Sequence, residues 1–109
     1  MKITFHNSKL KKLCERQKEA QRKLGQNCAR KLQSRLSDLM AAQSVAELVA
    51  GRPHPLEGDR AGEFAVDLAG GKRLVFKSEN DPIPKNEDGS IDWSNVTKIC
   101  IVFIGDYHD

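Results

Sequence analysis

Two short alternating segments joined by a glycine pair constrain the fold of this 109-residue chain more than any other feature. In residues 63–68 and again in residues 72–77, apolar side chains recur at every second position, which is the period of a β-strand. Gly70 and Gly71 lie between the segments and favour a two-residue hairpin turn, because such turns need positive φ angles. The segments are therefore predicted to be adjacent antiparallel strands with Arg73 and Lys77 on the same face.

The chain before this hairpin is predicted to be mainly helical. Apolar residues recur at helical offsets in residues 9–24, and Gly25 is expected to end that helix. A second helix is expected over residues 26–40, which makes a helical hairpin with the first. The sequence Ser44-Val-Ala-Glu47 matches a capping box and predicts a short third helix that ends near Ala50.

Further strands are predicted at the two ends of the chain. Residues 1–5 alternate and indicate a short edge strand, whereas residues 96–104 are apolar on both faces, as in a central strand. Residues 79–95 are predicted to be a long loop, and Trp93 is expected to anchor the end of this loop to the core. We therefore predict one domain, residues 1–109, of the α+β class: an N-terminal helical hairpin packed on a three- to four-stranded antiparallel sheet.

Charge is divided unevenly along the chain. Residues 1–50 carry 11 Lys and Arg against 4 Asp and Glu, whereas residues 51–109 carry 7 against 11. A basic half favours a polyanionic partner, most commonly the phosphate backbone of a nucleic acid. Well-solvated helices would have the same composition, so charge leaves both interpretations open.

Several classes of protein and site are disfavoured by what the sequence lacks. No apolar run approaches the ~20 residues that span a bilayer, and the first residues have no apolar core of a signal peptide, so a cytoplasmic protein without membrane contact is expected. The three cysteines are far apart and are predicted to be small buried side chains. The sequence shows no metal-ligand cluster, and neither a metal nor a cofactor is expected.

The order of these features resembles the RelE/ParE superfamily of toxins from type II toxin–antitoxin systems, and within it the HigB-like plasmid maintenance killer branch. The most specific matching parts are the segment from His54-Pro-Leu to Gly58-Asp-Arg60, the strand Arg73-Leu-Val-Phe76 and the terminal Asp106-Tyr107-His108. The resemblance implies a RelE-like fold and a ribosome-dependent endonuclease that cleaves messenger RNA without a metal. Its implied partners are the ribosome, mRNA and a HigA-like helix-turn-helix antitoxin, with operator DNA bound only through the antitoxin complex. ParE-like members instead inhibit DNA gyrase without nuclease activity, so that alternative stays open.

Cleavage of this type uses the RNA's own 2′-hydroxyl, so the protein must move protons and stabilise the charge on the phosphate. His54, held between two prolines, could transfer a proton, since imidazole titrates near neutral pH. Arg73 could hold the scissile phosphate, and the resemblance implies a catalytic arginine on this strand. The alternatives are a loop histidine and a surface cation.

The terminal residues complete the predicted site. Tyr107 could stack on a base or donate to the phosphate, His108 could be the second proton-transfer group, and Asp106 could orient one of them. Arg60 and Lys77 are predicted to add substrate affinity rather than chemistry. The alternatives are a frayed terminus and an Arg60 that only braces its own turn through Asp59.

Overall fold

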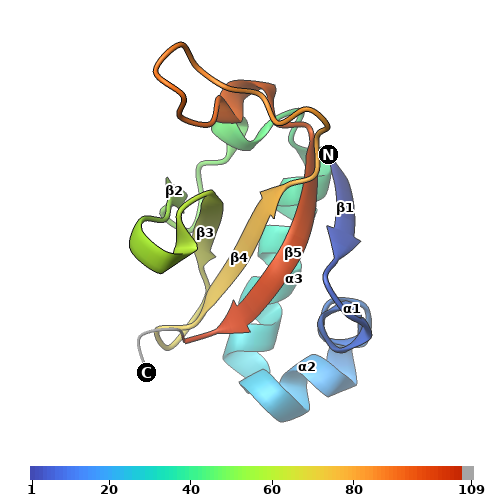
Figure 1. Ribbon diagram of the computed structural model, residues 1–109. Coiled ribbons are helices and arrows are strands. Elements are labelled where there is room, and N and C mark those ends of the chain that lie inside the picture. The colour runs from blue at the N-terminus through green and yellow to red at the C-terminus, as the bar shows by residue number, and fades with distance from the viewer. Residues whose placement is uncertain (107–109) are drawn as a thin grey trace.

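A computed structural model describes residues 1–106 of the chain, and its strands form one five-stranded sheet in the order β1-β5-β4-β3-β2 (Figure 1). Its elements, in chain order, are β1 (Lys2–Phe5), α1 (Ser8–Glu15), α2 (Gln17–Leu24), α3 (Gln26–Ala41), the 3₁₀ turn η1 (Val45–Glu47), β2 (His54–Pro55), η2 (Gly58–Arg60), β3 (Glu63–Asp67), β4 (Arg73–Ser78), η3 (Trp93–Asn95) and β5 (Lys98–Gly105). The predicted site residues Tyr107 and His108 lie outside the described residues.

The predicted α+β class is confirmed, but the sheet differs from the prediction in strand number and direction. β1 pairs with β5 in parallel, so the sheet is mixed rather than antiparallel. β2 adds a fifth strand of two residues at the other edge, antiparallel to β3. A two-residue strand containing Pro55 cannot show an alternating pattern, and proline is confined to sheet edges because it lacks an N–H.

The predicted hairpin is present, but its strands pair in a different register from the one that a two-residue turn would produce. Gly70 and Gly71 have φ of 66° and 79°, and the Lys72 N–H donates to the Ala69 carbonyl at 3.2 Å. However, Asp67 pairs with Arg73, which makes the loop one residue longer than the predicted two. A two-residue loop would place Asp67 opposite Leu74, whereas the observed register keeps Val66 opposite Leu74. Burial of the apolar face therefore decides the register.

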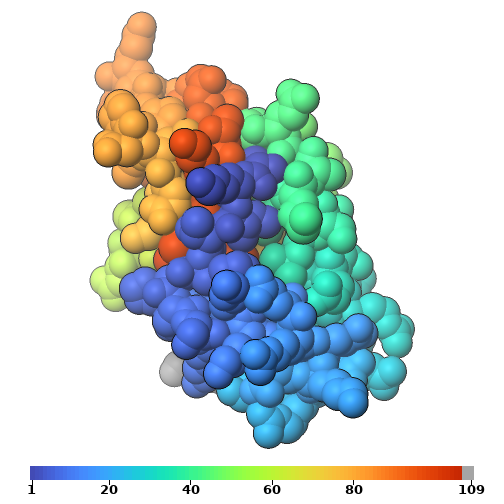
Figure 2. All heavy atoms as spheres, turned by 90° about the vertical axis from the view of Figure 1, so that its right-hand side faces the viewer, coloured from blue at the N-terminus to red at the C-terminus, as the bar shows by residue number. Residues whose placement is uncertain are grey.

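The first predicted helix is in fact two helices. Arg16 separates α1 from α2, and its backbone is extended with φ of −117° and ψ of 104°. A continuous apolar stripe would need an apolar residue at position 17, where the chain has glutamine. The break makes α1 and α2 a bent lobe below β1 (Figure 2). No helix in residues 1–106 is long and apolar enough to cross a membrane.

The predicted third helix is only the three-residue turn η1. Ser44 makes no capping hydrogen bond through its side chain, and the Val45 N–H donates instead to the Val96 carbonyl at 3.2 Å. Glu47 does reach back, but it accepts from the Gln43 N–H rather than from Ser44. Tertiary pairing with Val96 thus replaces the local helix start that the capping box predicted.

One face of the sheet packs on the helices and forms the core. α3 crosses behind β4 and β5 in Figure 1, and the core face of the strands contributes side chains with little or no exposure. These strand residues are Phe64, Val66, Leu74, Phe76, Ile99 and Ile101. Trp93 packs on Phe64 with ring centroids 4.8 Å apart, which confirms that it pins the end of the long loop.

The three cysteines are buried and free, as predicted. Burial, with a contribution from the charge of Glu15, raises the pKa of the Cys14 thiol to about 12. A thiol in this state is not a nucleophile at neutral pH.

Candidate functional site

The candidate site lies on the sheet face that points away from the helices. The registers align His54, Ala65, Val75 and Phe103 in one row across β2, β3, β4 and β5. The next row, two residues along, holds Asp67, Arg73 and Gly105. His54 and Arg73 therefore flank β3 on the same face, with Cα atoms on the order of 12 Å apart by strand spacing.

Asp67 is the centre of the contacts in this region. Its Oδ1 lies 3.1 Å from Arg73 Nε, and its Oδ2 accepts a hydrogen bond from Arg52 Nε at 2.9 Å. Its backbone is held as well, because its N–H donates to the Gly51 carbonyl at 2.6 Å and its carbonyl accepts from Arg35 Nε of α3. One residue thus joins the helical layer, the entry to β2 and the arginine of β4.

The charges around Asp67 keep it ionised. Burial would raise the pKa of this carboxyl, but the hydrogen bond from Arg52 and the positive charges of Arg52 and Arg73 outweigh it and hold the pKa below its ordinary value. The Arg73 side chain is only 15% exposed, against 65% for Arg52, so the pair combines an enclosed and an open guanidinium around one carboxylate.

The imidazole of His54 is oriented by the residue two positions before it. Its Nδ1 lies 2.7 Å from the carbonyl oxygen of Arg52. Because a carbonyl oxygen can only accept, Nδ1 carries the hydrogen, and in the neutral ring the lone pair is on Nε2. Arg52 adopts a φ of 50°, which is uncommon for a residue with a side chain and which aims its carbonyl at the imidazole.

Arg60 covers the middle of this face. Its guanidinium carbon lies 4.7 Å from the centre of the Phe103 ring, and its Nη1 pairs with Glu63 at 2.7 Å. This described ion pair joins Arg60 to the start of β3 rather than to its own turn at Asp59. A flat guanidinium on an aromatic ring is a surface on which a nucleic-acid base can stack.

The other predicted site residues lie at the two ends of the same face. Lys77 shares the face with Arg73 as predicted. It is the register partner of Glu63 on β3 and lies about 13 Å along the strand from Arg73. Asp106 follows Gly105, the residue opposite Arg73, and its carboxylate lies against the Gly70–Gly71 turn.

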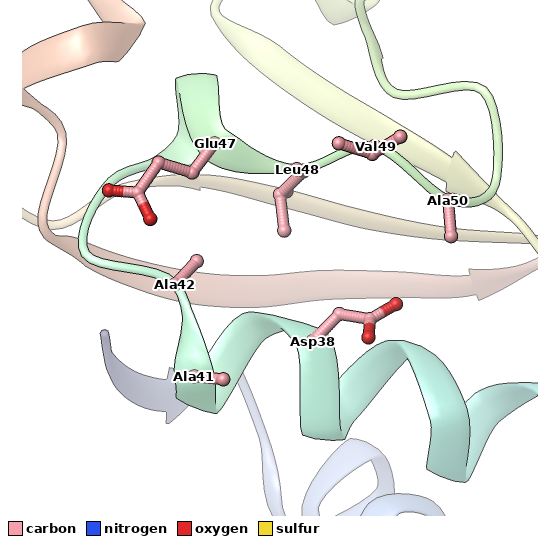
Figure 3. A pocket seen from close by; sticks show the side chains of 7 residues that line it. All are labelled: Asp38, Ala41, Ala42, Glu47, Leu48, Val49 and Ala50. Atoms are coloured by element: carbon pink, nitrogen blue, oxygen red, sulfur yellow. The ribbon is translucent and has the colours of Figure 1, made fainter.

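A hollow elsewhere among the described residues lacks this chemistry. A groove of about 330 Å³ runs between α3 and the segment after η1, where Asp38 and Ala42 face Leu48 and Ala50 (Figure 3). Its lining is mostly small and apolar, with carboxylates from Asp38 and Glu47 as its titratable groups. Within residues 1–106, no three His, Cys, Asp or Glu side chains gather in a way that could hold a metal ion.

The fold matches that of known bacterial toxins. A YoeB/ParE toxin from Agrobacterium tumefaciens matches with a TM-score of 0.60 over 98% of this chain and 99% of that chain, at 14% identity. The YoeB-YefM complex from Staphylococcus aureus gives a TM-score of 0.59 over 100% of this chain and 98% of the matched chain, at 15% identity. The chain shares its overall fold with these two structures. No protein-family model and no curated protein matches the sequence, so the likeness is one of structure.

The sequence did not identify Asp67, Arg52 or Phe103 as part of the site. A signal for Asp67 was available, because matching the apolar positions Val66 and Leu74 across the hairpin puts Asp67 opposite Arg73. Arg52 and Phe103 gave no such signal. Their roles depend on a positive φ before His54 and on a side chain of β5 that faces away from the core.

Proposed function

We propose that this protein is the toxin of a type II toxin–antitoxin pair, of the HigB-like kind, and that it cleaves messenger RNA on the ribosome. The observation that carries the proposal is the arrangement of His54, Arg73 and the Arg60–Phe103 stack on the sheet face opposite the helices of a toxin-type fold. A proton acceptor, a phosphate-binding cation and a stacking surface are what cleavage of single-stranded RNA requires.

In the proposed reaction His54 Nε2 accepts the proton of the ribose 2′-hydroxyl. The 2′-oxygen forms a bond to the adjacent phosphorus, the bond to the 5′-oxygen breaks, and a 2′,3′-cyclic phosphate remains on the upstream fragment. Arg73 binds the non-bridging oxygens, whose charge it stabilises in the transition state. His108 gives a proton to the leaving 5′-oxygen, and Tyr107 holds the neighbouring base. No step requires a metal.

The remaining residues of the face bind the substrate. Arg60 presents its guanidinium plane to a base, while Lys77 and Asp106 contact the RNA on either side of the centre. The proposed partners are the ribosome, a HigA-like antitoxin, and operator DNA through that antitoxin. A cytoplasmic location follows from the ribosome as the target.

Mapping the 5′ ends of cellular RNA after induction tests the proposal. Wild type should arrest growth and produce new 5′ ends inside translated messages. Arg73→Ala and His108→Ala should each lower the cleavage rate by about 10²–10³-fold, the cost of losing a group that stabilises or protonates the transition state. Lys85→Ala is the matched control, because Lys85 is an exposed cation of the long loop.

Two results would count against the nuclease. Full toxicity of Arg73→Ala and His108→Ala would remove the assigned site. Loss of supercoiled DNA before any loss of intact messages would instead favour the ParE-like alternative of gyrase inhibition.

A further inference from the structure

The contacts of Asp67 form a continuous path between the two residues that would do the chemistry. Arg73 Nε lies against one carboxylate oxygen at 3.1 Å, and Arg52 Nε donates to the other at 2.9 Å. The carbonyl of Arg52 in turn accepts from His54 Nδ1 at 2.7 Å. His54 and Arg73 are on different strands, and Asp67 of β3 lies between them in the sheet.

Arg52, in the middle of this path, has a strained backbone conformation that its neighbours must stabilise. A φ of 50° is strained for a residue with a side chain and persists only where its surroundings hold it. Arg52 is held on both sides by Asp67: through its own guanidinium and through Gly51, whose carbonyl accepts from the Asp67 N–H. Gly51 has no room for a side chain, since a Cβ there would lie 2.5 Å from Arg35 Nε and 3.1 Å from the Asp67 carbonyl.

We propose that Asp67 is a positioning residue that fixes the tautomer of His54 through Arg52 and the orientation of Arg73 directly. With Nδ1 bound to the Arg52 carbonyl, the Nε2 lone pair faces the substrate side as the proton acceptor. The same carboxylate pairs with Nε of Arg73 at 3.1 Å, and Nη1 of Arg73 donates to the Gly71 carbonyl at 3.2 Å, so both contacts orient the guanidinium. Asp67 itself touches neither substrate nor reacting atom.

The catalytic part of this inference rests on the proposed nuclease function, but the tautomer can be measured without any activity. In the full ¹⁵N-labelled protein, ring nitrogen shifts distinguish Nδ1–H from Nε2–H in neutral imidazole. His54 of the wild type should be protonated at Nδ1, with His6 as a reference in the same molecule. Asp67→Asn should change His54 to a mixture of tautomers and lower kcat for cleavage on ribosomes on the order of 10²-fold, with little change in KM.

Matched variants separate positioning from simple stability. Glu19→Gln removes another carboxylate that pairs with two cations, Arg22 at 2.7 Å and Lys23 at 3.3 Å on α2, and should leave the His54 tautomer and kcat unchanged. Arg52→Gly tolerates the positive φ but loses the anchor to Asp67, so it should lose part of the tautomer preference. Arg52→Lys keeps a cation for Asp67 and should retain more of it than Arg52→Gly.

An unchanged His54 tautomer in Asp67→Asn would overturn the inference, and so would an unchanged kcat in an active protein. If wild type shows Nδ1–H and Asp67→Asn does not, while neither cleaves RNA, the coupling stands and the nuclease function fails. A wild-type His54 protonated at Nε2 would contradict the coupling whatever the activity.

Discussion

The two faces of the sheet are specified in different ways. On the face under α3, strand residues such as Leu74, Phe76 and Ile101 are fully buried by other apolar side chains, and any arrangement that buries them satisfies the same requirement. On the opposite face, Asp67, Arg73 and Arg52 depend on individual contacts of 2.9–3.1 Å. The first face therefore sets the stability and register of the sheet, and the second uses that register to bring charged groups together.

The largest effect on stability should come from the core face. Phe76→Ala removes a fully buried ring that stacks on Phe64 at a centroid distance of 5.5 Å, and it should lower the free energy of unfolding by about 3–5 kcal/mol. Urea denaturation followed by circular dichroism measures the change.

Val75→Ala provides the comparison from the same strand. Val75 is also fully buried but lies on the site face opposite Phe103, and the loss of two methyl groups should cost roughly 1–2 kcal/mol. If the two variants lost the same free energy of unfolding, both faces would contribute alike to stability, which contradicts the assignment of stability mainly to the core face.

The same contrast explains how far the sequence could predict the molecule. Period-two patterns in residues 63–77 located the hairpin, and the apolar run of residues 96–104 located the central strand, because burial on one or both faces leaves a repeating signal. The break at Arg16 and the two-residue strand at His54 leave no repeat. The period of the strand was enough to predict which face Arg73 lies on. Predicting its partner Asp67 required the strand register as well, and predicting the role of Arg52 required a backbone angle that arginine rarely adopts.

An intermediate effect should appear as a pH dependence from the site face. The depressed pKa of Asp67 means that its ion pairs stabilise the fold above the carboxyl's ordinary value of 3.8, and that this contribution is lost as the pH falls through the lower folded value. Asp67→Asn should therefore lower the free energy of unfolding by about 1 kcal/mol near pH 7. The difference from wild type should disappear in strong acid.

Denaturation series at several pH values measure this difference, and Asp88→Asn is a useful control because the pKa of Asp88 is also lowered, by hydrogen bonds from Ser90 in the long loop. A gap between wild type and Asp67→Asn that stays constant down to strong acid would mean that the charge of Asp67 does not support the fold. Packing and neutral hydrogen bonds, rather than ion pairs, would then hold these side chains in place.

The smallest effect should come from the far end of the site face. Lys77 is exposed, about 13 Å along β4 from Arg73, and sits opposite Glu63, which already binds Arg60. Lys77→Ala should raise KM for ribosome-dependent cleavage by about 2–3-fold, the value of one solvent-screened contact, without a change in kcat. Steady-state kinetics at two salt concentrations separate this from chemistry, since a lost phosphate contact weakens the salt dependence. A fall in kcat as large as that of Arg73→Ala would move the reaction centre toward Glu63 and away from Asp67, because two residues so far apart cannot both contact one scissile phosphate.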